Sequence, residues 1–268
     1  MNLNRTLLFI FLSMISEVAF CQYLSLNKYF SDFYFHDKEE VESRRAEERF
    51  ARFLIDVVRL PRSEQVEQVQ SLLLRAEQAG CMERFMQLAE KYLYEPNSPY
   101  YNEGLYVVFL LYVVEHGDAS LSDFARYKHH YELIAKNQVG SRASDFSFVQ
   151  QNGLRGTLYG IESNYTVLFF NDPICQECNQ VKRQLENNYA TFEQKGIRVV
   201  AVYIDSEVAV WKKAVYHTSW LSVYAEDVDR KQLYNVRALP TLYLLDKQKR
   251  VLLKDVSVEK LIKYLEMI

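Results

Sequence analysis

The sequence predicts a chain of two parts, an all-α domain followed by an α/β domain with a central mixed sheet and helices on both faces. Three observations lead to this prediction. Residues 23–140 carry apolar side chains at helical spacing and lack the alternation typical of strands. Short continuous apolar runs, typical of buried strands, begin only after residue 140. These runs alternate with amphipathic helical patterns, which is the order expected of an α/β fold.

Length and composition agree with two compact domains. The chain has 268 residues, and a typical domain has about 150. Hydrophobic residues make up 49% and charged residues 25%, which supplies a packed core and argues against global disorder. The formal net charge is -3, and no segment combines Lys or Arg clusters with interleaved aromatic residues. We therefore expect no nucleic-acid partner.

Residues 1–21 have the pattern of a secretory signal peptide. Arg5 supplies the positive charge, and residues 6–15 form an apolar run too short to cross a bilayer about 30 Å thick as a helix. Small residues then mark a cleavage site. A lipoprotein anchored through Cys21 is the less favoured alternative, because Phe20 precedes this cysteine. No later apolar run is long enough to span a membrane, so we expect a periplasmic or secreted protein with no transmembrane span in the mature chain.

The helical domain is predicted to cover residues 22–140. Proline and glycine residues interrupt its apolar periodicity, most clearly at 95–99, and so separate successive helices. Cys81 precedes an amphipathic run and is expected to be buried and unreactive. His129 and His130 are expected to be a pair on the surface.

The α/β domain is predicted to cover residues 141–268. Its expected strands are the apolar runs 166–170, 197–204, 220–224, 241–245 and 251–253. The last two flank a polar turn and so indicate a hairpin. Helical patterns fill the other gaps, which gives the order β-α-β-α-β-β-β-α.

Cys175 and Cys178 form the only close pair among the four cysteines, and they lie where a buried strand gives way to a helix. At a helix N-terminus, free backbone N–H groups and the helix dipole favour a thiolate over a thiol. Cys178 lies one turn further along the same face, so its sulfur can reach Cys175. The spacing therefore predicts an attacking thiolate at Cys175, the more exposed of the two, and a resolving thiol at Cys178.

Two other roles for this cysteine pair are open at this point. A zinc site would need two more soft ligands, and the α/β part offers only His217. A purely stabilising disulfide would close a very small loop, so its entropic contribution would be slight. Thiol–disulfide exchange is favoured over both, and we expect no metal and no cofactor.

Pro240 lies directly before the predicted hairpin, in the segment Leu239-Pro240-Thr241. An ordinary trans proline at a strand edge is one interpretation. The favoured one is a cis Leu239–Pro240 bond, which turns the Leu239 backbone towards the Cys175 sulfur. There it can pair with an extended substrate peptide.

These features together resemble the thioredoxin-like fold, in its extracytoplasmic TlpA/ResA-like branch. The matching pieces within residues 143–268 are Ala143-Ser-Asp-Phe146, Val167-Leu-Phe-Phe-Asn-Asp-Pro173, the Cys175/Cys178 pair and Leu239-Pro-Thr-Leu-Tyr-Leu-Leu-Asp246. The resemblance implies an α/β thioredoxin-like domain with Cys175 as nucleophile, Cys178 as resolving thiol and Pro240 as the cis proline. The helical part, through Glu95-Pro-Asn-Ser-Pro99 and Asn102-Glu-Gly-Leu-Tyr106, resembles an uncharacterised domain that precedes such modules in secreted proteins of Gram-negative anaerobes.

Two departures from the thioredoxin pattern bear on the site. Ile174 stands where thioredoxins usually have Trp, directly before the first cysteine, and we expect it to contact substrate together with Leu239. Phe169 occupies the position where thioredoxins often have a buried acid that takes the proton from the resolving thiol. Glu177 is a candidate replacement, although a carboxylate so close to Cys175 also opposes thiolate formation.

The sequence thus predicts a thiol-disulfide oxidoreductase that acts on protein disulfides. Its electron partner is expected to be another, unidentified protein, because the chain has no second pair of this spacing. The alternative is a non-catalytic binding or scaffold protein, in which the helical domain recognises a partner and the thioredoxin-like domain is a redox-sensitive platform. Whether the pair reduces, oxidises or isomerises depends on its reduction potential, which spans roughly -270 to -120 mV in proteins of this fold.

Overall fold

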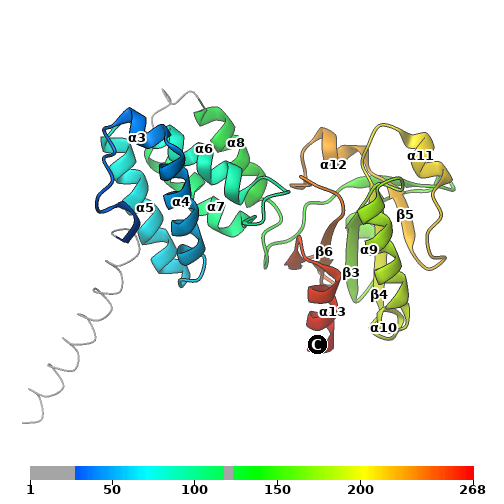
Figure 1. Ribbon diagram of the computed structural model, residues 1–268. Coiled ribbons are helices and arrows are strands. Elements are labelled where there is room, and N and C mark those ends of the chain that lie inside the picture. The colour runs from blue at the N-terminus through cyan, green and yellow to red at the C-terminus, as the bar shows by residue number, and fades with distance from the viewer. Residues whose placement is uncertain (1–27, 118–122) are drawn as a thin grey trace, which may run out of the picture. The chain divides into compact units, whose positions relative to one another are not determined.

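The computed structural model describes residues 28–117 and 123–268, and its contacts divide the chain into two compact units, Met1–Tyr131 and Glu132–Ile268 (Figure 1). The signal peptide expected at residues 1–21 lies outside the described residues. Within the described ranges, no helix combines the length and the apolar character needed to cross a bilayer.

The first unit is helical in the part that the structure describes, as predicted (Figure 1). Its helices are α3 (Lys38–Glu42), α4 (Arg44–Val57), α5 (Arg62–Gln78), α6 (Met82–Leu93) and α7 (Glu103–His116), and α8 (Phe124–Ala135) begins in this unit and ends beyond Tyr131. Side-chain caps start several of them: Ser43 accepts from Ala46 N–H at the start of α4, and Asn102 accepts from Leu105 N–H at the start of α7. Such caps satisfy N–H groups that have no partner within the helix.

Aromatic rings fill the core of this unit. Phe85 of α6 lies within ring-contact distance of Phe30, Phe33, Phe35 and Phe50, with centroids 5.6–6.1 Å apart. All five rings are buried. Burying one such side chain contributes about 1.5–3 kcal/mol, so these contacts hold α4 and α6 against the segment that precedes α3.

The expectation of a surface pair at His129 and His130 is wrong for the second residue. His130 is only 8% exposed, and its Nδ1 lies 3.1 Å from the hydroxyl of Tyr106. The reason is helical periodicity: His130 shares the buried face of α8 with Tyr127 and Ile134, whereas His129 points to solvent.

The second unit is built around a mixed sheet, as predicted, and this sheet has seven strands in the order β2-β1-β5-β4-β3-β6-β7. The strands β3, β4 and β5 are parallel to one another, and the other neighbouring pairs are antiparallel. The strands are β1 (Ser147–Gln150), β2 (Arg155–Thr157), β3 (Tyr165–Phe170), β4 (Ile197–Tyr203), β5 (Leu221–Tyr224), β6 (Thr241–Leu245) and β7 (Val251–Lys254).

Helices cover both faces of this sheet, because successive residues of the central strands face opposite sides. One core contains Val167, Phe169, Val199 and Ala201. It is covered by α9 (Gln176–Asn187), α10 (Tyr189–Gln194) and α13 (Val258–Glu266). The other core contains Leu168, Phe170, Val200 and Val202, and α12 (Glu226–Arg230) packs against it through Val228. The remaining helices are the short α11 (Val208–Lys213) and the 3-10 turn Leu158–Gly160.

The hairpin of β1 and β2 was not predicted. It extends the sheet beyond β5, where Val149 is paired with Tyr224. Both strands are short and only partly buried, so they carry no continuous apolar run. The turn does contain a usable signal, since Asn152-Gly153 is a dipeptide that favours tight hairpins and Gly153 has a φ of +87°.

The division between the two units lies earlier than the predicted boundary at residues 140–141. Asn137 explains the difference, because it is buried within the second unit and adopts a φ of +54°. Its amide donates to the carbonyl of Leu233 at 2.8 Å and accepts from Ser144 N–H at 2.7 Å. The chain therefore joins the α/β unit before its composition changes.

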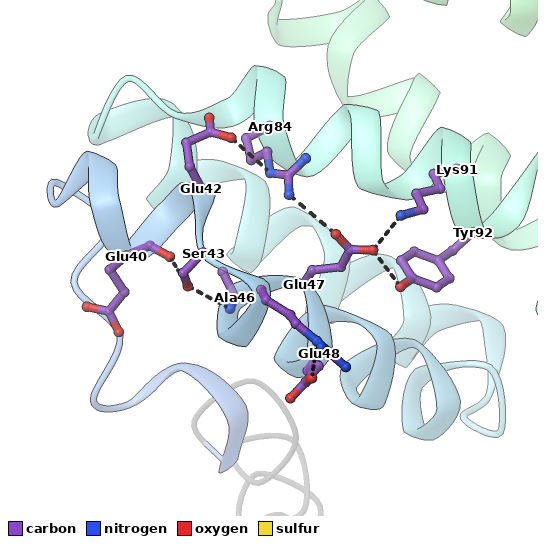
Figure 2. Close-up of polar contacts among 10 residues, drawn as sticks. Glu40, Glu42, Ser43, Ala46, Glu47, Glu48, Arg84, Lys91 and Tyr92 are labelled. Atoms are coloured by element: carbon purple, nitrogen blue, oxygen red, sulfur yellow. Dashed lines mark hydrogen bonds and ion pairs between the residues drawn. The ribbon is translucent and has the colours of Figure 1, made fainter.

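A polar cluster around Glu47 connects α4 to α6 (Figure 2). The Glu47 carboxylate accepts from Lys91 Nζ at 2.6 Å and from the Tyr92 hydroxyl at 2.8 Å, and Arg84 lies 3.5 Å away. The hydrogen bond from Lys91 is the main reason that the pKa of Glu47 is lowered. Burial, followed by the bond to Glu47, raises the pKa of Tyr92 to about 12.

We predict that Glu47→Gln destabilises the helical unit by about 1 kcal/mol at neutral pH, because it removes the charge that three neighbours share. Because the pKa of Glu47 is lowered on folding, its contribution is present above the ordinary carboxyl pKa. The difference between wild type and variant should shrink as the pH falls below the ordinary carboxyl pKa and vanish only below the lowered pKa that Glu47 has in the folded protein. Urea unfolding followed by circular dichroism at several pH values measures this.

Glu48→Gln is the matched control. Glu48 is the next residue of α4, but its side chain is 53% exposed, against 23% for Glu47, and it pairs only with the exposed Arg44. We expect a change within about 0.5 kcal/mol. Both tryptophans of the chain lie in the second unit. An unfolding transition that changes the circular dichroism signal but leaves tryptophan fluorescence unchanged therefore reports unfolding of the helical unit. Equal effects of the two variants would refute the role assigned to the Glu47 cluster.

Candidate active site

Cys175 is the N-cap residue of α9, as the sequence predicted. The strand β3 ends at Phe170, and a short loop carries the chain to the start of the helix. The Cys175 sulfur accepts a hydrogen bond from the backbone N–H of Cys178 at 3.3 Å. A sulfur in the usual place of a capping oxygen meets free N–H groups and the positive end of the helix dipole, both of which stabilise a thiolate.

The two thiols differ in exposure. Cys178 is only 2% exposed, whereas Cys175 is half-buried, and both are free thiols. The backbone N–H of Asp172 donates to the Cys178 sulfur at 3.5 Å. Burial, and then the hydrogen bond with Cys175, raises the pKa of the Cys178 thiol to about 12. Cys175 is therefore the sulfur that a partner molecule can reach, and Cys178 stays protonated behind it.

The Leu239–Pro240 peptide bond is cis, which confirms the favoured interpretation of this proline and excludes an ordinary trans proline. The carbonyl oxygen of Leu239 lies 3.9 Å from the Cys175 sulfur, within the range of a weak S–H donor. This loop leads directly into β6, which is paired with β3. Sheet pairing thus brings the proline loop to the cysteine that follows β3.

Ile174 and Glu177 lie on the exposed side of the site. The Ile174 side chain is 75% exposed, beside the reachable sulfur. Glu177 is also exposed, and its Oε2 lies 3.5 Å from the Cys175 sulfur. The Glu177 carboxylate thus contacts the half-exposed thiol Cys175 and does not line the pocket beside Cys178.

Phe169 fills the position where thioredoxins often have an acid. It is fully buried, and its ring meets Trp220 edge to face with centroids 6.3 Å apart. Trp220 and Trp211 are both buried, as expected for core residues. This part of the core therefore supplies no proton acceptor to Cys178.

The structure brings polar residues to Cys178 that the sequence analysis did not select. A pocket of about 210 Å³ adjoins this thiol, and its polar lining includes Asn171, Asp172, Lys182 and Tyr216. The Tyr216 hydroxyl donates to Asn171 Oδ1 at 2.7 Å. The polar pair directly after β3 was a usable signal, since the carboxyl ends of parallel strands often carry functional side chains. The sequence around Tyr216 contains no motif that would have predicted its place beside Cys178.

No set of His, Cys, Asp and Glu side chains suited to a metal ion occurs in residues 28–117 and 123–268. His217, the candidate extra zinc ligand, lies 2.7 Å from Ser219 Oγ through its Nδ1 and packs on the ring of Tyr189. Cys81 lies in the helical unit and is half-buried, not fully buried as expected. Its burial raises the pKa of its thiol to about 11, which agrees with the expected low reactivity.

Comparison with known families places each part of the chain. Residues 163–251 match the family described as thioredoxin-like, and residues 13–137 match the domain of unknown function DUF5106. A solved structure of a thioredoxin-like protein from Bacteroides caccae aligns with a TM-score of 0.83 and 28% sequence identity, and the alignment covers 92% of each chain. This similarity extends over both units of the chain.

Similarity to individual curated proteins is confined to part of the chain. The thiol-disulfide oxidoreductase ResA of Bacillus cereus is 27% identical over 137 residues, which cover 50% of this chain and 79% of ResA. Human nucleoredoxin is 25% identical over 119 residues, which cover 42% of this chain but only 27% of nucleoredoxin. The cis-proline loop beside a helix-capping cysteine agrees with these matches: the chain carries a thioredoxin-like domain in its C-terminal part, after a helical part that matches the uncharacterised domain DUF5106.

Proposed function

We propose that this protein is a thiol-disulfide oxidoreductase that acts on protein disulfides through Cys175 and Cys178. One observation carries the proposal. A half-exposed sulfur caps a helix and faces the backbone of a cis-proline loop, and a buried thiol lies directly behind it. Similarity to ResA of Bacillus cereus, a thiol-disulfide oxidoreductase by name, supports the same reaction class.

The reaction proceeds in two exchanges. The Cys175 thiolate attacks one sulfur of a substrate disulfide, so an S–S bond forms to the substrate, the substrate disulfide breaks, and one substrate thiolate leaves and takes up a proton. Cys178 then loses its proton and attacks the Cys175 sulfur. The mixed disulfide breaks, the second substrate thiolate leaves, and the Cys175–Cys178 disulfide remains. The reverse sequence oxidises a dithiol substrate.

The surroundings of Cys175 suit an extended peptide. The Leu239 carbonyl offers a backbone acceptor beside the sulfur, and Pro240 holds that carbonyl in place. Ile174 presents an exposed apolar side chain on the same side. The exposed Glu177 carboxylate lies 3.5 Å from the Cys175 sulfur, at the edge of this surface.

We place this activity in the periplasm or outside the cell, on the strength of the signal peptide expected at residues 1–21. A compartment of that kind lets disulfides persist, so it contains substrates for such a pair. Another protein must then accept or supply the electrons, since the mature chain has only one close cysteine pair.

The first test is reduction of insulin by the mature protein with dithiothreitol as the electron donor. Cys175→Ser is expected to lower the rate to the uncatalysed background, a loss of at least about 100-fold, because it removes the attacking thiolate. Cys81→Ser is the matched control and should retain wild-type activity, since Cys81 lies in the other unit. If Cys175→Ser reduced insulin at the wild-type rate, the proposal would be refuted.

A second prediction concerns trapping of substrates in cells. In Cys178→Ala, Cys175 can still attack a substrate disulfide, but no resolving thiol remains to free the substrate from Cys175. Mixed disulfides with substrate proteins should therefore accumulate, and treatment with a reductant should remove them. The double variant Cys175→Ser/Cys178→Ala is the control and should trap nothing. Absence of mixed disulfides, together with a stable non-covalent partner, would favour the binding or scaffold alternative.

A further inference from the structure

The buried thiol Cys178 must lose its proton before it can attack, and burial has raised its pKa far above neutral pH. The position of the acid that often serves this purpose is filled by Phe169, which is fully buried in the apolar core. Glu177 contacts the Cys175 sulfur and is exposed to solvent. The second exchange therefore needs an acceptor on the inner side of the cysteine pair.

We propose that the Asp172 carboxylate accepts the proton of Cys178 when this thiol resolves the mixed disulfide, and returns it in the reverse direction. This inference rests on the proposed function and adds a proton-accepting residue to its second step. Asp172 directly precedes the Pro173–Ile174 pair that leads to Cys175. The residue therefore lies on the loop that carries the nucleophile.

Two hydrogen bonds and a shared pocket place Asp172 beside the buried thiol. Its backbone N–H donates to the Cys178 sulfur at 3.5 Å. Its Oδ1 accepts from the N–H of Ile174 at 3.0 Å, which holds the carboxylate on the loop. Asp172 and Cys178 also line the same pocket of about 210 Å³. A pocket of that size can hold several water molecules, so a proton can pass from sulfur to carboxylate through solvent.

The other polar groups of this pocket are poorer acceptors. Asp172 is the only carboxylate among its lining residues. Burial raises the pKa of the Tyr216 hydroxyl, and this hydroxyl donates to Asn171 Oδ1, so Tyr216 remains a donor. The Lys182 ammonium donates to the carbonyl of Val215 and lies 5.1 Å from the centre of the Tyr216 ring, and as a cation it accepts no proton.

The electrostatics of the pocket fit a transfer between these two groups. The negative charge of Asp172 contributes to the raised pKa of Cys178, so the two groups are close enough to interact. Direct ionisation of Cys178 would place a second negative charge beside the carboxylate. Transfer of the proton to Asp172 moves the charge instead of adding one, since Asp172 becomes neutral as Cys178 becomes a thiolate. The thiolate then attacks Cys175, and the proton reaches the departing substrate thiolate through solvent.

Single-turnover reaction with the chromogenic disulfide dithiobis(nitrobenzoate) tests the proposal, in full mature protein carrying Cys81→Ser so that only the pair reacts. Attack by Cys175 releases the first coloured thiolate, and resolution by Cys178 releases the second. Asp172→Asn should slow the second phase by at least about 10-fold at neutral pH and leave the first phase within about 2-fold. Asn keeps the oxygen that accepts from Ile174 N–H, so the loop retains its capping bond.

A purely electrostatic role predicts the opposite sign. If the carboxylate acted only through its charge, its removal would lower the pKa of Cys178 and accelerate the second phase. An unchanged or faster second phase in Asp172→Asn therefore overturns the proposal. Glu177→Gln is the matched control: it removes the carboxylate on the Cys175 side and should alter the first phase and not the second.

The pH dependence of the second-phase rate can be measured in the protein without any substitution at Asp172, so this test does not require that a variant folds correctly. The titratable groups that interact with Cys178 or share its pocket are Asp172, Cys175, Tyr216 and Lys182. Tyr203 interacts with Asp172 and Tyr216, and Glu177 contacts Cys175. With an internal acceptor, the wild-type rate should change little between pH 6 and about pH 8, because hydroxide from solvent then takes no part in removing the proton. A rise of about tenfold per pH unit in wild type would show that hydroxide removes the proton and would refute the role of Asp172.

These outcomes are distinct from failure of the proposed function. If the wild-type protein released no first coloured thiolate, Cys175 would not be an attacking thiolate and the oxidoreductase itself would be refuted. If the first phase is normal and the rate of the second phase is the same in wild type and Asp172→Asn, only the role of Asp172 as proton acceptor is refuted. Asp172→Glu should restore part of the second-phase rate if a carboxylate is what this position requires.

Discussion

The hydrogen bond from the Cys178 backbone N–H to the Cys175 sulfur is the contact on which the site depends. It exists because α9 begins directly after Cys175, a few residues beyond the end of β3. The strand β3 is buried on both faces and paired on both edges, with β4 and with β6. The start of α9 is therefore held by the centre of the sheet, and the sulfur is held at the positive end of the helix dipole.

The same arrangement separates the chemistry of two identical side chains. One sulfur lies at the surface beside a backbone carbonyl and a carboxylate, and the other lies under the helix beside a polar pocket. Exposure leaves the Cys175 sulfur open to a partner molecule, and desolvation raises the pKa of the Cys178 thiol. The Glu177 carboxylate lies 3.5 Å from the outer sulfur, and Asp172 lines the pocket beside the inner one.

Prediction from sequence succeeded for strands with apolar runs and for the site motifs, and it missed short half-buried strands and residues whose partners lie far along the chain. The five apolar runs correspond to β3 to β7. The strands β3, β4 and β6 are buried on both faces and so carry continuous apolar sequence, whereas β5 and β7 are only partly buried. The hairpin of β1 and β2 was missed because its strands are short and half-buried, although Asn152-Gly153 marks its turn. The position of His130 follows from helical periodicity once Tyr127 and Ile134 are recognised as core residues. Asn137 could not be assigned to the second unit, since its partners Leu233 and Ser144 are known only from the fold.

The sequence by itself determined the elements of the site: a cysteine pair one helical turn apart after a buried strand, and a proline directly before a hairpin. Spacing along a helix and apolar runs are local properties, so they can be recognised without coordinates. Tertiary structure decided which sulfur is exposed, that Leu239 lies 3.9 Å from Cys175, and that Tyr216 and Asp172 line the pocket behind Cys178. These relations join segments that are distant in sequence. Sheet pairing and close packing place such segments together, and neither leaves a signature in any one stretch of the chain.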